Sequence, residues 1–372
     1  MRGRILLSFV SGIICVGVVL YIYPHSEKIL LKSVPGDVSA ETQDGEKFSV
    51  KSNEEEPVKK QRDNLPSKIK SDCKKVVRAS QKSQNVDPRI WSEVKYLLFF
   101  IGHFRSGTSL IGSLLDAHPN IVLAHEFGTL GRWEKWSKEQ KTRDYLFQEL
   151  FSKSERDSRG AGVRSPWRHC YVDQYAFAIP TQWQGKFDKN IKIIGDKQSE
   201  QVVSILLSRP EGALPEIQKI VKIPFKFIYI VRNPFDVAAT RMIRKYSPKL
   251  NHEERKELYN NPLNYTKKWQ VQEVKRLASL IHGAVKLTTR FGNDVIAIHS
   301  EDMIKNPVQE LKKMCTFFDV KCSKKYLDDC AHIVYANPSK TRNMIKWNEE
   351  AKQILTNITK NVSYFKKYSF DE

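Results

Sequence analysis

The chain of 372 residues is strongly basic, with 62 Lys and Arg against 42 Asp and Glu and a net charge of +20. A field of this sign attracts acidic partners. The six cysteines lack the spacing of a zinc site and no histidine pair at metal spacing accompanies them, so we expect no metal centre.

An uncharged segment near the start of the sequence predicts a membrane anchor. Residues Ile5 to Tyr23 are 19 consecutive residues without charge, long enough to cross a bilayer as a helix. The segment ends in Tyr-Ile-Tyr-Pro, not in the small residues of a signal-peptide cleavage site. Arg2 and Arg4 favour a cytosolic N-terminus. We therefore expect a cytosolic tail (1–4), a transmembrane signal-anchor (5–23) and a luminal remainder.

Residues 24–92 have the composition of a flexible, disordered stem. Phe48 and Trp91 are their only aromatic residues, so the segment buries too little apolar surface to offset the entropy of ordering. Residues 1–92 account for +5 of the net charge, which leaves +15 on residues 93–372. These are enough for one luminal α/β domain. In the lumen, acidic or sulfated glycans and acidic proteins are favoured over nucleic acid as partners.

A glycine-bearing loop lies between the first predicted strand (Tyr96 to Ile101) and a predicted helix (Thr108 to Ala117). From Gly102 to Ser109 the loop reads GHFRSGTS, which is the spacing of a Walker A phosphate loop with Thr108 in place of the lysine. Such a turn points backbone N–H groups and the positive end of a helix dipole at an anion. Arg105 can bind a phosphate or sulfate oxygen, whereas the missing lysine argues against a magnesium triphosphate.

Further strands are predicted at 120–124, 191–194, 225–231 and 295–299, and helices at 199–207, from Pro234 onwards, at 265–290 and at 307–318. This alternation predicts a P-loop-type α/β fold, with a mostly parallel sheet covered by helices on both faces. Ligands of such sheets bind beyond the carboxyl ends of the strands. Arg105, Glu126, Lys197 and Arg232 each follow a predicted strand, so we expect them to meet at one edge.

Glycosylation sequons and the cysteines are consistent with a luminal location. Asn264, Asn357 and Asn361 each begin an Asn-X-Ser/Thr glycosylation sequence. Cys15 lies in the predicted span and leaves an odd number of luminal cysteines, so at least one is free or pairs between chains. Cys315, Cys322 and Cys330 lie close together in sequence and predict a local disulfide.

Two of these segments together resemble the nucleotide-binding motifs of sulfotransferases, which use 3′-phosphoadenosine 5′-phosphosulfate (PAPS) as donor. The first is Phe104 to Ser109 and the second is Val231 to Thr240, within a resemblance that covers about residues 95 to 350. The Asp-Ala-His-Pro stretch at 116–119 is most similar to the membrane-bound Golgi branch, which includes carbohydrate and tyrosylprotein sulfotransferases. Ser339 to Arg342 resembles the final nucleotide-contacting loop of the family.

The resemblance implies a role for each candidate residue. The 5′-phosphosulfate would be held by Arg105, Ser106, Gly107, Thr108 and Ser109, and the 3′-phosphate by Arg232, Thr240, Arg244 and Arg342. Glu126, which lies 21 residues after Arg105, would be the general base. Arg105 and Lys197 would stabilise the transferring sulfuryl group. Asp196 and His125 are lesser candidates for the base, and PAPS is the only cofactor implied, as a co-substrate without a metal.

The sequence leaves the identity of the acceptor open. After Glu126 the chain reads Phe-Gly-Thr where the tyrosylprotein branch has an arginine, and Ala124 replaces its cysteine, so we expect a glycan before tyrosine. A kinase-like enzyme is disfavoured by Thr108, and a non-catalytic basic protein of the same fold would bind glycan but not the donor. The expected partners are a glycan or acidic protein acceptor and the Golgi membrane, without nucleic acid; a homo-oligomer is compatible with the sequence.

Overall fold

The computed structural model describes residues 86–160, 162–165, 168 and 176–371. The predicted anchor (5–23) and most of the predicted stem (24–92) lie outside these residues. Among the residues described, no helix combines the length and apolar character needed to cross a membrane.

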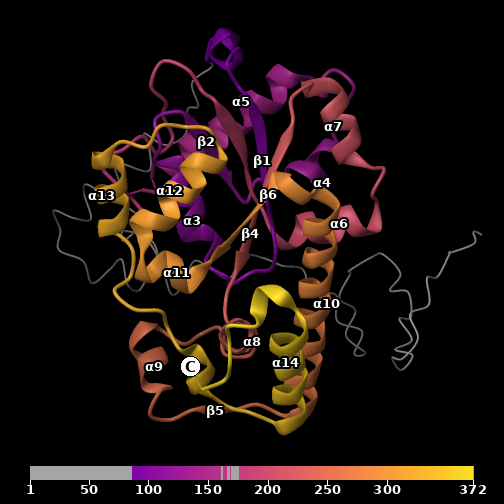
Figure 1. The fold of residues 1–372 in the computed structure, drawn as a ribbon, viewed down its shortest axis with the longest axis vertical. Helices are drawn as coiled ribbons and strands as arrows, with labels where there is room; N and C mark the ends of the chain where they lie inside the picture. Colours follow the sequence, from indigo (N-terminus) through magenta and orange to yellow (C-terminus); the bar gives the residue numbers. More distant parts are fainter. Residues whose placement is uncertain (1–85, 161, 166–167, 169–175, 372) are drawn as a thin grey trace, which may run out of the picture. The chain divides into compact units, whose positions relative to one another are not determined.

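Within the described residues, five parallel strands form the central sheet, in the order β2-β3-β1-β4-β6 (Figure 1). They are β1 (Tyr96–Ile101), β2 (Ile121–His125), β3 (Ile193–Lys197), β4 (Phe225–Val231) and β6 (Val295–His299). A second, two-stranded pairing joins β5 (Leu263–Asn264) to β7 (Ile345–Lys346). The mostly parallel sheet predicted from the sequence is confirmed, and the order places β1 at its centre.

Alternate side chains of the central strand enter two separate cores. Leu97, Phe99 and Ile101 pack with helices on one face of the sheet, and Leu98 and Phe100 pack with helices on the other. The first face carries α4 (Thr129–Trp133), α5 (Arg143–Asp157), α6 (Glu200–Ser208), α7 (Ala213–Val221), α8 (Pro234–Tyr246), α10 (Lys267–Phe291) and α14 (Glu349–Asn361). The second carries α3 (Thr108–Asp116), α11 (Ser300–Lys305), α12 (Pro307–Phe317) and α13 (Lys324–His332), and a short α9 (His252–Glu257) follows α8. Because β1 and β4 are covered on both sides, their residues read as nearly continuous apolar runs.

The predicted strands and helices agree with the structure to within one or two residues at each end, apart from the third strand. The third strand was expected at 191–194 but runs through Lys197, because it pairs with β2 as far as the partners His125 and Lys197. The two polar residues at its end concealed this extension. The helix after the phosphate loop begins at Thr108, as predicted, and its N-cap is Gly107, without a side-chain cap.

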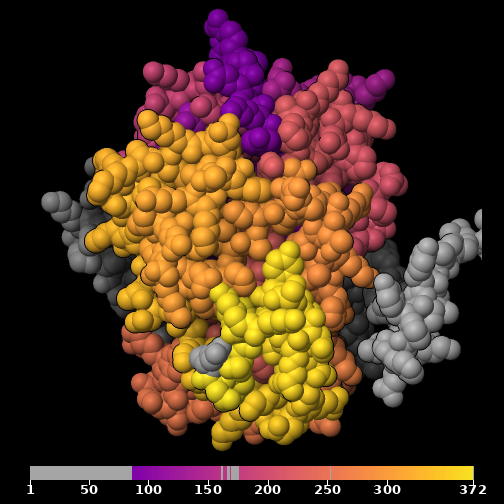
Figure 2. Space-filling model, in the orientation of Figure 1, coloured from indigo at the N-terminus to yellow at the C-terminus, as the bar shows by residue number. Residues whose placement is uncertain are grey.

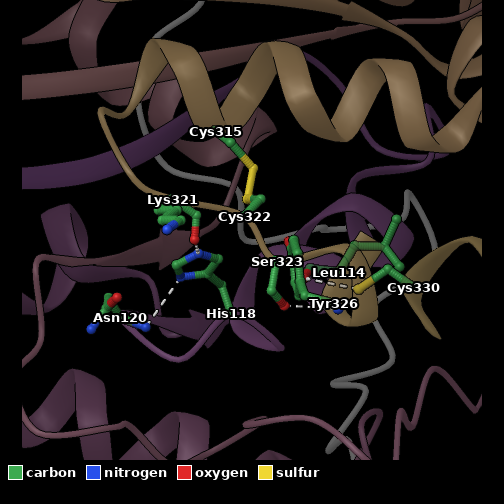
Figure 3. Close-up of a disulfide and its surroundings, with 9 residues drawn as sticks. All are labelled: Leu114, His118, Asn120, Cys315, Lys321, Cys322, Ser323, Tyr326 and Cys330. Atoms are coloured by element: carbon green, nitrogen blue, oxygen red, sulfur yellow. Dashed lines mark hydrogen bonds between the residues drawn. A yellow bond between two sulfur atoms is a disulfide. The ribbon is translucent and has the colours of Figure 1, made fainter. Parts of the chain in front are cut away.

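The predicted local disulfide joins Cys315 to Cys322 and fixes the connection between α12 and α13 (Figure 3). Beside it, His118 Nδ1 accepts a hydrogen bond from the Asn120 backbone N–H at 3.1 Å, and Nε2 lies 3.3 Å from the Lys321 carbonyl oxygen. Cys330 is buried and is not part of a disulfide. The histidine of the Asp-Ala-His-Pro stretch therefore holds the α12–α13 connection in place. Cys15, Cys73 and Cys170 lie outside the described residues.

The segment after α14 closes over the start of α8, and Figure 2 shows it in yellow on the surface of the molecule. The Asn233 side chain donates to the Ser369 carbonyl at 2.9 Å, and the Tyr368 hydroxyl donates to Glu301 at 2.6 Å. Glu301 in turn accepts the backbone N–H of Asn233 at 2.9 Å. Residues far apart in sequence thus fix the turn that follows β4.

Candidate active site

The carboxyl ends of the strands meet at one edge of the sheet. In the ladders, His125 of β2 is level with Lys197 of β3, and Val231 of β4 is level with His299 of β6. The phosphate loop follows β1 at the centre of this edge. The expected convergence of Arg105, Glu126, Lys197 and Arg232 follows from this register, because each lies at or just beyond a strand end.

The phosphate loop presents an open helix start. Gly107 has a φ of 96°, in the left-handed region that glycine adopts without strain, and no side chain caps the helix that follows it. A Cβ at this position would lie 2.8 Å from Ser300 Oγ, so close packing against α11 also requires glycine. The Ser106 hydroxyl donates to the His103 carbonyl at 2.8 Å and stiffens the loop. The uncapped N–H groups at the start of α3 provide the geometry of an anion site.

The reacting end of the site is built around Lys197. Its ammonium donates to Glu126 Oε1 at 2.7 Å and to Ser109 Oγ at 3.2 Å, so it connects the end of β2 with the first turn of α3. The Lys197 side chain is 1 % exposed. Burial lowers the pKa of Lys197, and the Glu126 carboxylate opposes this effect. A buried cation therefore lies beside the phosphate loop, held there by a carboxylate.

Glu126 is presented to solvent by a strained backbone. Its φ is 52°, and its N–H donates to the Lys197 carbonyl at 3.2 Å, so both its main chain and its side chain contact β3. The side chain is 46 % exposed. Left-handed conformations of non-glycine residues cost about 1–3 kcal/mol and gather at functional sites. Arg105, with a φ of 72°, is a second such residue, and it is exposed on the phosphate loop.

Asp196, a lesser candidate for the base, is completely buried and has a structural role. It accepts hydrogen bonds from the N–H groups of Phe127, Gly128 and Thr129 at 3.0, 2.8 and 2.8 Å, and from the Thr129 hydroxyl at 2.9 Å. Burial raises the pKa of Asp196. With both oxygens occupied, this carboxylate fixes the chain that follows Glu126.

His125, the other lesser candidate, lies 4.0 Å from the Glu126 carboxylate through Nε2. Burial lowers its pKa, and the nearby Lys197 acts in the same direction. A neutral imidazole with a depressed pKa is a weak proton acceptor. Of the three candidates, Glu126 therefore combines exposure to an acceptor with a fixed position.

At the other end of the site, Arg232 connects the phosphate loop with a loop from the C-terminal part of the chain. Its guanidinium donates to the Arg105 carbonyl at 2.8 Å and to Ser339 Oγ at 3.0 Å. Thr240, two turns into α8, donates to the Asp236 carbonyl at 2.8 Å and lies 3.0 Å from the Thr341 hydroxyl. Ser339 and Thr341 thus join the group of residues that sequence reasoning assigned to this end.

Arg244 is half-buried, one turn beyond Thr240 on α8, whereas Arg342 lies beneath the surface. The Arg342 side chain is 3 % exposed, pairs with Asp236 at 2.5 Å and donates to the Phe370 carbonyl at 2.7 Å. Its backbone N–H donates to the same aspartate at 2.8 Å. Through these contacts Arg342 positions the 339–341 loop against α8. Because the guanidinium of Arg342 is buried, its contact with a phosphate stays a prediction.

A profile of the sulfotransferase family matches residues 98–324, a range that begins within β1, extends beyond β6 and contains the phosphate loop, Glu126, Lys197 and Arg232. The chain belongs to the sulfotransferase family. It is an enzyme, a sulfotransferase. A search of curated proteins returned no match.

Solved structures of sulfotransferases share low identity with this one. The sulfotransferase STF9 from Mycobacterium avium is 11 % identical, with 82 % of this chain and 90 % of that chain covered and a TM-score of 0.41. The sulfotransferase domain of the Synechococcus PCC 7002 olefin synthase is 12 % identical, with 75 % and 98 % covered and a TM-score of 0.39. Mouse sulfotransferase SULT7A1, complexed with PAP, is 14 % identical, with 75 % and 92 % covered and a TM-score of 0.35.

Sequence reasoning missed the ionic network behind the phosphate loop of this sulfotransferase. Glu200 accepts the Phe104 backbone N–H at 3.3 Å and pairs with Arg241 at 2.7 Å and with Arg276 at 3.1 Å. Arg241 also pairs with Glu273 at 2.5 Å. Burial opposes ionisation of Glu200, but the arginines outweigh it and lower its pKa. The signal available in the sequence was a set of charged residues at core-facing positions of amphipathic helices, whose partners lie 32 to 96 residues away.

A second buried pair explains the aspartate of the Asp-Ala-His-Pro stretch. Asp116 and Arg164 are both fully buried and lie 2.7 Å apart. Asp116 also accepts the Leu123 N–H at 2.6 Å and the Ser154 hydroxyl at 2.8 Å, which joins α3, β2 and α5. This stretch therefore has a structural role in the sulfotransferase.

Proposed function

We propose that this sulfotransferase transfers the sulfuryl group of PAPS to a hydroxyl of a glycan, with Glu126 as general base. The single observation that carries the assignment of the base is the Glu126–Lys197 pair beside Ser109. It places a half-exposed carboxylate and a buried cation next to an uncapped helix start.

Glu126, Lys197 and Arg105 would have separate roles in an in-line displacement. An acceptor oxygen forms a bond to sulfur while the bond between sulfur and the 5′-phosphate oxygen breaks. Glu126 takes the acceptor proton, and the bond's electron pair leaves on the phosphate oxygen. Lys197 and Arg105 would offset the negative charge on the transferring group and on the departing oxygen. The products are a sulfated hydroxyl and the 3′,5′-bisphosphate nucleotide.

The donor would lie along the edge of the sheet. The N–H groups from Ser106 to Ser109 would hold its 5′-phosphate, and Arg232, Thr240 and Arg244 would hold its 3′-phosphate. Each charge-assisted hydrogen bond contributes roughly 1.5–3 kcal/mol when shielded from water. The Arg232 bridge to Arg105 and Ser339 supports this assignment, because it links the two phosphate ends through one side chain.

A glycan acceptor is supported by two features. The charge of +15 on residues 93–372 favours an acidic polymer or glycoprotein. The N–H groups of Phe127 to Thr129 bind Asp196, and this turn carries no arginine that could meet a peptide. We further propose a Golgi membrane location through residues 5–23 and glycosylation at Asn264, Asn357 and Asn361. All three asparagines are exposed.

The test is transfer of radiolabelled sulfate from PAPS by the full-length protein to glycosaminoglycans, neutral glycans and tyrosine peptides. For Glu126→Gln we expect transfer about 10²- to 10⁴-fold slower, with binding of the product nucleotide unchanged. Glu211→Gln, at an exposed site on the α6–α7 connection, is the matched control and should transfer at the normal rate.

Four outcomes would contradict the proposal. Unimpaired transfer by Glu126→Gln would remove Glu126 as the base. Failure of the wild-type protein to bind the nucleotide would exclude PAPS. Transfer to tyrosine peptides alone would make the protein a tyrosylprotein sulfotransferase, and nucleotide-independent binding of glycan without transfer would favour a non-catalytic binding protein.

A further inference from the structure

The outer face of α10 carries charge of one sign only. The helix has six Lys and Arg residues, all exposed, namely Lys267, Lys268, Lys275, Arg276, Lys286 and Arg290. Its single acidic residue, Glu273, is 2 % exposed and pairs with Arg241 inside the protein. The exposed positive charges of α10 are therefore not balanced by any acidic residue of the same helix, which is unusual for a long surface helix.

Three of these side chains lie along one line. Lys268, Lys275 and Lys286 are separated by 7 and 11 residues, which are two and three turns of an α-helix. We call these three, with the flanking Arg276 and Arg290, the α10 basic strip. From Lys268 to Arg290 it extends about 33 Å at 1.5 Å per residue. Lys268, Lys275 and Lys286 form no ion pair with any residue that the structure describes.

The strip reaches the phosphate loop through one residue. Arg276 is bound to one oxygen of Glu200 at 3.1 Å, and the other oxygen of Glu200 accepts the Phe104 backbone N–H at 3.3 Å. Phe104 is 37 % exposed. Figure 1 shows α10 beside α6, and a Cβ on Gly283 of α10 would lie 2.5 Å from Leu207 of α6. Arg276 therefore links the strip to the start of the phosphate loop through Glu200.

The residues between the basic side chains identify the kind of occupant. Gln272, Ser279 and His282 are exposed and polar, and they fall on the same side of the helix. Interfaces with folded proteins are anchored by clusters of apolar and aromatic side chains in closely packed centres. On α10 a single large apolar side chain is exposed, Trp269 at 41 %, and its ring stacks on Tyr246. A line of separated cations with hydrogen-bonding groups between them instead suits an extended polymer with regularly spaced negative charges.

We propose that the α10 basic strip docks the acceptor, a linear anionic glycan carrying sulfate or carboxylate groups, and so leads one of its hydroxyls to Glu126. This inference rests on the proposed function and names the acceptor class. Binding releases counter-ions from the polymer, so the affinity falls as salt rises. A short acceptor that reaches only Glu126 gains nothing from the strip.

The test compares two full-length triple variants that each lose three positive charges. Lys268→Ala/Lys275→Ala/Lys286→Ala removes the centre of the strip. Lys219→Ala/Lys312→Ala/Lys321→Ala is the matched control, since its three lysines are exposed on other elements. The probes are a heparin oligosaccharide long enough to span the strip and a polynucleotide of equal length. Binding is measured by fluorescence anisotropy at several salt concentrations, and binding of the product nucleotide is measured alongside.

For the strip variant we expect heparin affinity to fall by about tenfold or more, with a shallower dependence on salt. The control should stay near the wild-type value, and nucleotide binding should be unchanged in both. In transfer assays the strip variant should show a raised KM for a polymeric anionic acceptor and an unchanged KM for a short one.

If the control variant lost as much heparin affinity as the strip variant, the effect would come from net charge alone and the proposal would be overturned. Tighter or equal binding of the polynucleotide, weakened to the same degree by the strip variant, would overturn the choice of a glycan. These failures leave nucleotide binding and transfer intact, whereas loss of nucleotide binding by the wild-type protein would overturn the proposed function itself.

Discussion

The Asp196→Asn variant tests whether Asp196 has a structural role or is the catalytic base. The buried Asp196 side chain accepts four hydrogen bonds from Phe127, Gly128 and Thr129. Asparagine has nearly the same shape but offers one acceptor oxygen, and its amide group would face at least one backbone donor. The turn after Glu126 would then lose its charged acceptor and leave an N–H group unpaired.

The magnitude follows from these contacts. A hydrogen bond to a charged group is worth about 1.5–3 kcal/mol, and a buried donor left unpaired costs about 1–3 kcal/mol. Since the amide oxygen keeps some of the bonds, we expect Asp196→Asn to lower the free energy of unfolding by about 2–4 kcal/mol. For a domain of this size the midpoint of thermal unfolding should fall by roughly 5–10 °C.

The assay combines urea unfolding, thermal unfolding, nucleotide binding and transfer for Asp196→Asn and Glu126→Gln. We expect the first variant to lose stability together with activity. The second should lose activity with little loss of stability, because the half-exposed side chain of glutamine keeps an oxygen that can accept the Lys197 hydrogen bond. A variant Asp196→Asn with normal stability and normal nucleotide binding but no transfer would refute this reasoning and place Asp196 in the chemistry.

Three further predictions test other parts of the structure. Gly112→Ala should lower kcat by about 10- to 100-fold while nucleotide binding persists, because the added Cβ would lie 2.8 Å from Lys197 Cγ and displace its ammonium; normal kinetics would contradict this. Burial lowers the pKa of His103 from 6.5 to about 4, so the unfolded chain binds a proton there that the native protein does not. Stability should therefore fall as pH drops from 6.5 towards 4, by about 3 kcal/mol from this residue, and urea unfolding of His103→Leu should show a flatter pH dependence. Cys315→Ser should destabilise the oxidised protein by about 2.5 kcal/mol, since the disulfide closes a short loop with a sequence separation of 7, and a reductant should affect the wild-type protein but not the variant.

The sequence predicted the frame of the site because that frame depends on local signals. Apolar runs that are buried on both faces mark β1 and β4. Arg105 lies in the loop after β1, and Arg232 directly follows β4. Glu126 and Lys197 could be placed at the same edge since parallel strands end together.

The sequence could not tell Glu126 from Asp196 as the base. The difference lies in hydrogen bonds between residues 67 to 69 positions apart, which only the folded sheet brings together. The same holds for Arg342, whose position against Asp236 spans 106 residues. In the sequence Asp196 looks like a candidate base and Arg342 like a phosphate ligand, and their burial is a property of the fold.

The closure of α8 by the yellow segment in Figure 2 has a consequence for synthesis of the protein on the ribosome. Asn233 and Arg342 reach the carbonyl groups of Ser369 and Phe370, so the surroundings of Arg232 are completed by residues translated more than 130 positions later. The central sheet can assemble while translation continues, but this phosphate-binding turn must wait for the last of these contacts. A nascent chain halted before Tyr368 would therefore hold a formed sheet and an unfinished donor site, and nucleotide binding would report that translation had passed this point.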